Sequence, residues 1–565
     1  MKNRSIIRLS LCFTVFIFWA FFYSNHVLFS EQLSLFLYTS DFWKQHALQP
    51  GGWSVYCGNF LAQFYINYWV GALLQTMLFA VLLVLSVRIL KKTDSCEKLS
   101  PAAVFPAMLL LALQFDYRFT PGNTLALICP FALTLLYMNM PRVAMRRLVF
   151  TLAFVPVYLF SGAAATCCLY AVLVIFEWMN AKDRWRYVTS AWLVIAVILP
   201  RLWQFVYPIP DENLYQIVDY PTDEGIGYIP VALLAWIPIC VLLVRLIPLQ
   251  RLKEKLTTVI IISLLLACGW YFFPKKYQRL DEQKFGMYLS VLQTDWDQVL
   301  QTGKHVKTPD KQAACLINLS LAMKGELPQK MFSYPQTNEY GLLPVHEREI
   351  LDMLYGSTFF YHIGILNEAI RWIFDSNILR RKGMDYLTLT KLATWNKENG
   401  YEQVAGKYFD ILSHTLMYRA YAKRERNAPV LQREKTANQV EYYVGGREPL
   451  TDLAWHYENN YQNRMILDYM LCCLLLKNDL KKFEKLFNSF YNPPKILPKA
   501  YQEALTEMVD FKMTDIRNYP VDSNNEIRLR NFKKLFSTGN EKELEKQFGD
   551  TWWYYSYQKM KKTMK

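Results

Sequence analysis

Two acidic residues could carry out proton transfer at a membrane surface. Glu31 and Asp41 lie within residues 25–65, among leucines, phenylalanines and Trp43. Apolar surroundings destabilise the charged form of a carboxylate, which can then take a proton from a hydroxyl as a general base. The alternative is that both acids face water on the polar side of an interfacial helix. On the first interpretation, Glu31 and Asp41 are the candidate catalytic residues.

Two arginines could bind a lipid phosphate. Arg118 lies in a tight turn between two apolar runs, and Arg201 is the single basic residue within its own apolar run. A guanidinium matches the geometry of a phosphate, and an ionisable residue in an apolar run is a functional hypothesis by default. Extension of the Arg201 side chain to the headgroups is the alternative. Arg118 and Arg201 are therefore candidate ligands of a lipid phosphate.

Other kinds of chemistry have little support in the sequence. The seven histidines and eleven cysteines show no metal-ligand or disulfide spacing, and there is no Walker, Rossmann or H-E-x-x-H motif. We therefore expect no metal and no cofactor. The acidic loop at 208–227 is either solvated or holds a divalent cation, although its spacing matches no EF-hand. The basic excess of the first half of the chain is explained by membrane topology, so the net charge of +15 does not predict nucleic-acid binding.

Nine apolar runs are predicted to span a membrane and to position these residues. Several are shorter than the roughly 20 residues that cross a bilayer, so short or tilted spans are implied. Residues 148–178 could form one helix, and Ser161-Gly162 is the only break signal within them. The runs lie near 6–24, 66–89, 101–115, 123–139, 148–161, 163–178, 188–207, 228–248 and 256–273.

The charges of the loops predict the orientation. With the N-terminus in the cytoplasm, seventeen basic residues fall in cytoplasmic loops, against Lys44 and Arg118 in the opposite loops and Arg201 near a span end. A single span at 148–178 would move the basic cluster at 182–186 to the wrong side, so two spans are predicted there. The sequence thus predicts a multi-pass protein of a bacterial inner membrane, with its C-terminal domain in the periplasm.

The second half of the chain is polar and helical, with internal similarity. Turns between paired helices are expected at Gly325, Gly364, Gly400 and Asn478. Gly, Ala and an apolar residue recur with spacings of five and four residues, at positions Gly364, Ala369 and Ile373 and again at Gly400, Ala405 and Phe409. This pattern resembles the tetratricopeptide repeat, although a non-repetitive helical bundle is the alternative. The predicted fold class is all-α, with a polytopic helical membrane domain over 1–273 followed by a tetratricopeptide-like α-solenoid over 274–565.

Two further resemblances bear on function. The stretches Glu31–Asp41 with Pro50–Gly52, Asn318–Gly325 and Leu497–Leu505 resemble an uncharacterised family of Bacteroidota multi-pass membrane proteins, a domain of unknown function. The arrangement of a long first exported loop, short spans and an exported tail also resembles GT-C glycosyltransferases. That resemblance implies an acid that activates an acceptor and a basic residue that holds a polyprenyl-phosphate donor. The paired acids of that family are absent, since Glu31 and Asp41 stand ten residues apart.

Three functions remain open from the sequence. The first is a scaffold in envelope biogenesis, whose periplasmic helical-repeat domain binds other envelope proteins. The alternative is a GT-C-like glycosyltransferase that uses a polyprenyl-phosphate-linked sugar at the outer face of the membrane. A passive transporter is the third. Membrane lipids are expected partners in each case.

Overall fold

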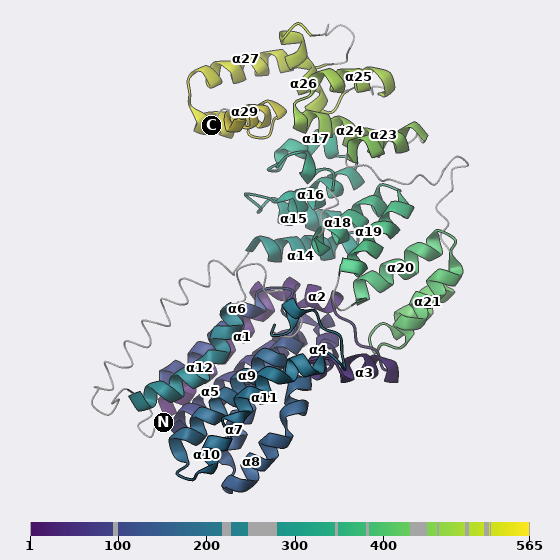
Figure 1. Ribbon diagram of the computed structural model, residues 1–565. Helices are drawn as coiled ribbons and strands as arrows, with labels where there is room; N and C mark the ends of the chain where they lie inside the picture. Colours follow the sequence, from purple (N-terminus) through teal and green to yellow (C-terminus); the bar gives the residue numbers. More distant parts are fainter. Residues whose placement is uncertain are drawn as a thin grey trace. The chain divides into compact units, whose positions relative to one another are not determined.

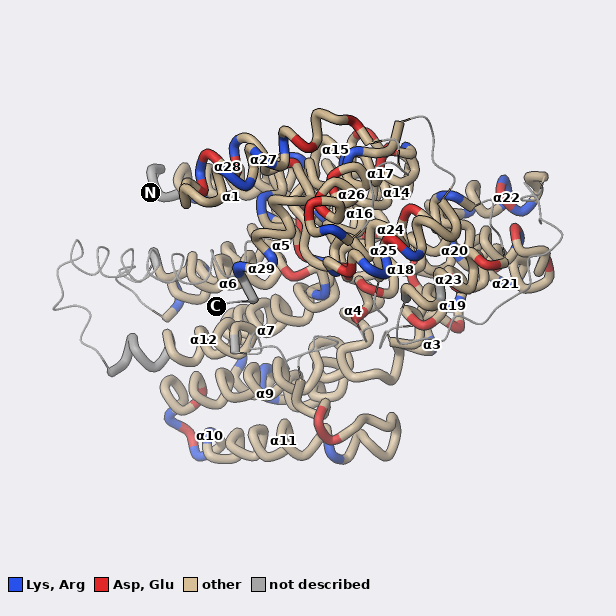
Figure 2. Tube along the Cα trace, turned by 90° about the horizontal axis from the view of Figure 1, so that it is seen from above, with Lys and Arg blue, Asp and Glu red and all other residues tan. Residues whose placement is uncertain are grey.

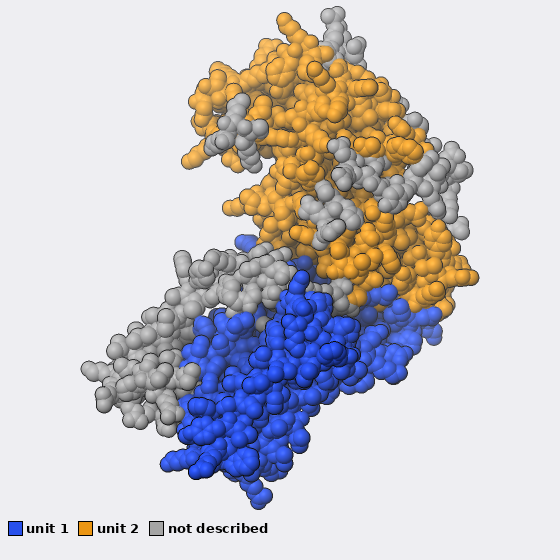
Figure 3. Space-filling model, viewed as in Figure 1, with its two compact units in different colours: residues 1–279, 384–387, 410–424 blue, residues 280–383, 388–409, 425–565 orange. Residues whose placement is uncertain are grey.

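The computed structural model is helical and contains no strand in the residues that it describes. These residues are 2–93, 100–216, 228–246, 279–344, 349–379, 383–429, 449–459, 463–491, 496–513, 519 and 521–563. They form two compact units (Figure 3). The first unit contains residues 1–279, 384–387 and 410–424, and the second contains residues 280–383, 388–409 and 425–565.

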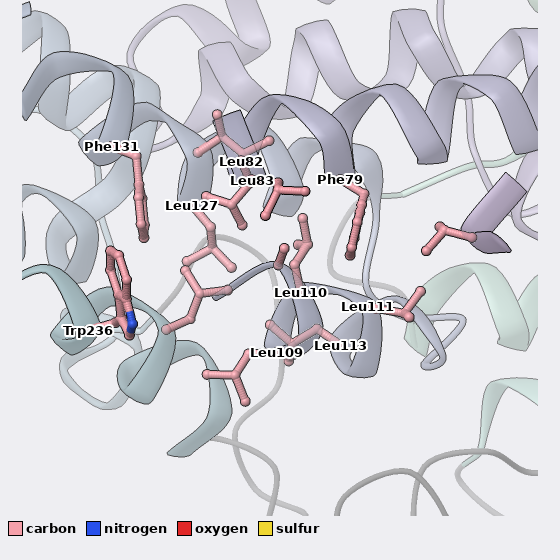
Figure 4. Close-up of a cluster of buried hydrophobic side chains, with 14 of the residues drawn as sticks. Phe79, Leu82, Leu83, Leu109, Leu110, Leu111, Leu113, Leu127, Phe131 and Trp236 are labelled. Atoms are coloured by element: carbon pink, nitrogen blue, oxygen red, sulfur yellow. The ribbon is translucent and has the colours of Figure 1, made fainter. Parts of the chain in front are cut away.

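The first unit holds the apolar half of the chain (Figure 1). Its helices are α1 (Lys2–Ile17), the π-helical turn η1 (Phe18–Phe22), α2 (Ser24–Gln32), α3 (Ser40–Ala47), α4 (Gly52–Ala62), α5 (Tyr68–Thr93), α6 (Val104–Gln114), α7 (Pro121–Asn139), α8 (Val143–Leu152), α9 (Phe154–Asn180), α10 (Trp185–Val188), α11 (Ala191–Trp203) and α12 (Tyr228–Leu246). Figure 4 shows side chains of its hydrophobic core, with Phe79, Leu82 and Leu83 of α5 beside the leucines of α6.

The predicted count of nine spans is wrong for the described residues. By length and composition, three helices are long and apolar enough to cross a membrane, namely α5, α7 and α9, and α9 consists of two helical segments joined at Gly162. A fourth is possible if the helices Ile6–Phe22 and Ser24–Gln32, bent by 72°, cross together. The run at 101–115 contains the 11-residue helix α6, which is buried by its neighbours along almost its whole length. Its hydrophobicity therefore reflects burial within the unit. The predicted span at 256–273 lies outside the described residues.

The predicted break at Ser161-Gly162 is confirmed. Gly162 has φ 74° and ψ −178°, a conformation that is not helical. The rings of Phe154 and Tyr170 stack with centroids 3.7 Å apart, and the Tyr170 hydroxyl donates to the Phe150 carbonyl oxygen at 2.7 Å. Along a continuous helix, Phe154 and Tyr170 would lie about 24 Å apart. The chain therefore reverses at Gly162, and the two halves of α9 lie side by side.

Several basic loops meet at one end of the first unit. Arg147 pairs with Asp183, at 2.6 Å between Nη1 and Oδ2, and both Arg146 and Arg147 pair with the buried Glu177. The Lys92 ammonium donates to the Met138 carbonyl oxygen at 3.3 Å. The end of α5, the end of α7, the start of α8 and the residues that follow α9 therefore lie together, and they carry several Lys and Arg residues.

The second unit is built from successive helix pairs (Figure 1). Its helices, some of which begin or end with residues of the first unit, are α14 (Arg279–Leu292), α15 (Trp296–Gly303), α16 (Lys311–Met323), α17 (Leu327–Lys330), α18 (Ile350–His362), α19 (Leu366–Leu379), α20 (Tyr386–Glu398), α21 (Glu402–Ser413), α22 (Arg419–Asn427), α23 (Pro449–Asn459), α24 (Arg464–Lys477), α25 (Leu480–Phe490), α26 (Lys499–Asp510), α27 (Asn524–Ser537), α28 (Glu541–Phe548) and α29 (Trp552–Thr563).

The four predicted turn residues are confirmed as the residues that end helices. Gly325, Gly364, Gly400 and Asn478 all have positive φ values, between 60° and 93°. Each turn has two backbone hydrogen bonds of the Schellman motif; at Gly400, Tyr401 N donates to Asn396 O at 2.8 Å and Gly400 N donates to Lys397 O at 3.0 Å. The motif satisfies carbonyl groups that the end of a helix leaves free. It lets one helix end and the next begin within four residues.

Candidate functional site

An aromatic bend at the end of α1 positions the candidate site in the first unit. Trp19 and Tyr23 are fully buried, and their rings lie 5.7 Å apart between centroids. Phe115 packs on Tyr23 at 5.5 Å. The helix widens to a π-turn over Phe18–Phe22, and the next helix, α2, leaves at 72°. Single π-turns of this kind are frequent at functional sites. The bend directs the last turn of α2, which carries Glu31, away from the axis of α1.

Glu31 is a buried carboxyl group with two different oxygen environments. The residue is 1% exposed. Its Oε2 atom accepts hydrogen bonds from the Tyr418 hydroxyl at 3.0 Å and from Gln32 Nε2 at 2.6 Å. Its Oε1 atom is buried and has no hydrogen-bond partner among the described residues. A buried polar oxygen without a partner is costly, and such atoms are frequently explained by a functional role.

Two tyrosines from the second half of the chain complete this site. Tyr386 and Tyr418 stack with ring centroids 4.5 Å apart and an interplanar angle of 18°. Tyr386 N donates to Ser34 O at 3.0 Å, and the Tyr386 hydroxyl accepts from Phe36 N at 3.1 Å. Residues 384–387 and 410–424 belong to the same compact unit as α2. We call Glu31, Gln32, Tyr386 and Tyr418 the Glu31 site.

The electrostatics of the Glu31 site keep the tyrosines protonated. Burial, followed by the charge of Glu31, raises the pKa of Tyr418 well above its usual value. Burial also raises the pKa of Tyr386. The Tyr418 hydroxyl therefore remains a hydrogen-bond donor to Glu31 Oε2. Gln32 Nε2 donates both to Glu31 Oε2 and to the Tyr418 hydroxyl. Oε1 is left to accept a proton or a hydrogen bond from a ligand hydroxyl or amine.

Asp41, the other predicted catalytic acid, lies in a different environment. Its side chain is 80% exposed and pairs with Lys44 at 3.0 Å in the first turn of α3. Thr39 caps the same helix, accepting a hydrogen bond from Phe42 N at 3.3 Å. An acid in the first turn of a helix stabilises it through the helix dipole. Glu31 is therefore buried, whereas Asp41 is exposed to solvent.

The two predicted phosphate ligands each pair with a nearby acid. Arg118 binds Asp116 through two hydrogen bonds, Nε to Oδ1 at 3.1 Å and Nη2 to Oδ2 at 3.0 Å. Arg201 pairs with Asp211 of the acidic loop at 2.6 Å, and both side chains are more than half exposed. These pairs reduce the positive charge that either arginine offers to a phosphate. In the described part of the chain, no group of three or more His, Cys, Asp or Glu could hold a metal ion.

A second buried acid, Glu177, has its hydrogen-bonding capacity filled. Its Oε1 atom accepts from the Tyr137 hydroxyl at 2.7 Å and from Arg146, and its Oε2 atom accepts from Arg147 at 2.8 Å. This carboxylate joins α7, α8 and α9 and offers no free oxygen to a ligand. In contrast to Glu177, the buried Glu31 keeps one oxygen, Oε1, without a hydrogen-bond partner among the described residues.

Sequence reasoning missed the tyrosines of the Glu31 site. Tyr418 is 387 residues from Glu31, and Tyr386 is 350 residues from Phe36. No periodicity or motif links these positions. The one local signal was the acid itself among apolar residues.

The fold and the site define an all-helical protein with membrane-type helices and a buried acidic site in the unit that contains them. The sequence matches the family of unknown function DUF6057 over residues 1–559, and the chain belongs to this family. No curated protein matches the chain significantly. No solved structure does so either.

Proposed function

We propose that this protein is a membrane-anchored scaffold whose second unit binds other proteins of the bacterial envelope. The observation that carries the proposal is the series of helix pairs in that unit, joined by Schellman turns of the same geometry. Successive helix pairs present extended surfaces that suit protein binding. We interpret the series as a tetratricopeptide-like solenoid.

The orientation proposed is an N-terminus in the cytoplasm and a second unit in the periplasm. Basic loops that gather at one end of the first unit favour the cytoplasm. The segments at 384–387 and 410–424 contact α2 and the residues directly after it. Lys2, Arg4 and Arg8 lie at the start of α1, whereas α2 follows the opposite end of that helix. This supports a periplasmic position for these two segments of the first unit in an inner-membrane protein.

Exposed apolar residues on α19 provide a test of the scaffold. Phe374 and Ile378 are one helical turn apart, and 44% and 66% exposed. A photo-reactive amino acid at position 378 should give a discrete cross-linked partner in cells, and Phe374→Asp with Ile378→Asp should abolish it. Lys407→Asp, on the exposed part of α21, is the matched control. The proposal fails if photo-reactive groups at 378 and at the exposed Val404 and Ile496 all yield no partner.

A second candidate is a transferase that uses a polyprenyl-phosphate-linked sugar, favoured by the free Oε1 atom of Glu31. In such a reaction the acceptor oxygen attacks the anomeric carbon and its proton passes to Glu31. The bond from that carbon to the lipid phosphate breaks, and the lipid phosphate leaves. The Tyr418 hydroxyl would hold the other carboxylate oxygen in place.

One comparison separates the two candidates. Glu31→Gln retains the shape of the side chain but cannot accept the proton as a base. If the protein is a transferase, the Glu31→Gln variant should fail to complement a deletion of the gene. If the protein is a scaffold, the variant should complement it. Mass spectrometry of the purified protein should detect a bound polyprenyl phosphate only for the transferase. Hydrogen exchange of α2 in the Glu31→Gln variant controls for a loss of folding.

A further inference from the structure

A short basic segment of the second half of the chain belongs to the unit that carries the membrane-type helices. Residues 410–424 pack within the first unit, and they include the start of α22. Arg419, Lys423 and Arg424 are all exposed there, and Figure 2 shows basic and acidic residues along α22. The first six residues of this helix, Arg419 to Arg424, contain no acid.

The tether of this segment holds it near the end of the first helix. Tyr418, the residue before Arg419, donates a hydrogen bond to Glu31 in the last turn of α2. The helix α2 has nine residues, so it is about 13 Å long. Since it is turned by 72° from the helix before it, its far end rises only about 4 Å along the axis of that helix. With the end of the first helix at the boundary of the hydrocarbon core, a displacement of this size stays within the headgroup layer of a bilayer.

Apolar and aromatic residues next to the segment fit the same layer. Leu416, three residues before the start of the basic helix, is 52% exposed. Tyr38 is 46% exposed and donates its backbone N–H to His414 O at 2.9 Å. Trp43, on the adjoining helix α3, is 41% exposed. Tyr and Trp are enriched where membrane meets water, and basic residues beside exposed apolar ones characterise segments that lie on a membrane surface.

We propose that Arg419, Lys423 and Arg424 dock on the phosphates of anionic lipid headgroups. Charge complementarity and the tether to α2 select lipid headgroups over a soluble partner. Docking would hold residues 410–424 against the membrane and so keep Tyr418 on Glu31. The inference rests on insertion of the first unit in a membrane and is independent of whether the protein is a scaffold or a transferase.

Hydrogen exchange in lipid nanodiscs tests this surface. The full chain is placed in nanodiscs of phosphatidylcholine alone and in nanodiscs with phosphatidylglycerol added. Each basic residue near an anionic surface contributes about fivefold to binding. We expect the amides of residues 419–424 to exchange at least about fivefold more slowly with phosphatidylglycerol, and high salt to remove the difference.

Variants and a soluble probe decide the outcome. The triple variant Arg419→Gln, Lys423→Gln and Arg424→Gln should reduce the difference between the two nanodiscs to less than about twofold. Lys533→Gln with Lys534→Gln, on α27 of the second unit, should leave it unchanged. Equal exchange in both nanodiscs overturns the proposal, as does a difference that persists in the triple variant. Equal protection by glycerophosphate in phosphatidylcholine nanodiscs also overturns it, because a free phosphate is then sufficient. A negative result in these experiments does not bear on the scaffold proposal, which is tested separately by cross-linking at position 378.

Discussion

At the scale of single residues, the first unit contrasts two buried glutamates. Glu177 has both oxygens engaged by two arginines and a tyrosine. Glu31 has one oxygen engaged by Tyr418 and Gln32 and one without a hydrogen-bond partner among the described residues. A fully paired buried acid is a structural link, whereas a half-paired one has capacity left for a ligand.

Removal of the Tyr418 hydroxyl should destabilise the first unit. Tyr418→Phe leaves Glu31 Oε2 with only its bond from Gln32. A buried hydrogen bond of this kind contributes roughly 0.5–1.5 kcal/mol. We expect the variant to unfold at a lower temperature in detergent, as measured by differential scanning fluorimetry. Tyr408→Phe, which removes a hydroxyl from α21, should be close to neutral; equal effects of both variants would contradict the role of Tyr418.

Glu503 should make the stability of the second unit depend on pH. Its side chain is buried on α26 and accepts a hydrogen bond from Trp552 N at 2.7 Å. Burial raises the pKa of Glu503 from its usual 4.5 to about 7, and burial also raises the pKa of Glu507 to about 7. Between about pH 4.5 and 7 the folded state binds more protons than the unfolded state, so stability falls as pH rises.

The Glu503 share of this pH dependence can be measured directly. Hydrogen exchange of α26 and α29 at pH 5 and pH 7.5, corrected for the intrinsic effect of pH, should show weaker protection at the higher pH. Glu503→Gln should reduce that loss, and a second substitution, Glu507→Gln, should remove the remainder. An unchanged pH dependence in the double variant would show that other groups are responsible.

At the scale of elements, the turns of the second unit follow local rules. A residue after the last turn of a helix that adopts positive φ is usually Gly, or Asn less often. The sequence placed Gly325, Gly364, Gly400 and Asn478 at such positions, and each one has positive φ. These turns could be predicted because their physics depends on a single residue and its neighbours in the chain.

Gly400 offers a clean measurement of that backbone preference. Its φ is 85°, and a Cβ atom there would meet no other atom within 4 Å. Gly400→Ala should therefore cost about 1 kcal/mol from conformation alone. Gly406→Ala, inside α21 where the new Cβ makes only an ordinary contact with Arg426, should be stabilising by up to roughly 1 kcal/mol. Chemical denaturation of both variants compares the signs, and a stabilising Gly400→Ala would contradict the left-handed turn.

The membrane helices could be predicted less well. Apolar runs show which segments are shielded from water, but they do not distinguish lipid from protein as the shield. The helix α6 is apolar because other helices surround it. The break in α9 could be predicted, since Gly162 is the residue that tolerates φ 74° there. The lengths of the helices could not be predicted, because the residue at which each helix ends depends on packing against neighbouring elements.

At the scale of the whole molecule, the first unit is not a continuous piece of chain. It requires residues 384–387 and 410–424, which carry both tyrosines of the Glu31 site. No sequence pattern could place Tyr386 and Tyr418 beside α2, because their contacts are tertiary and separated by more than 300 residues. The candidate acid was therefore predictable from the sequence, and its partners were not.

A double variant should show that these segments stabilise the first unit. Tyr386→Ala with Tyr418→Ala removes the stacked pair that covers Glu31. We expect faster hydrogen exchange in α2, with α24 to α26 of the second unit unchanged. Tyr457→Ala with Tyr491→Ala, two buried positions of the second unit, should give the reverse pattern. Unchanged exchange in α2 would show that the tail segments are dispensable for the first unit.

The discontinuity of the first unit also sets an order of events during synthesis. The last residue that it needs, Arg424, leaves the ribosome 145 residues after Arg279, where its long N-terminal segment ends. At typical rates of translation, this interval lasts roughly 7–30 s. For most of that time the apolar helices lack Tyr418, and Glu31 lacks its complete cover. The interval is a window in which a chaperone could hold the unfinished unit, and in which the carboxyl group of Glu31 is open to water.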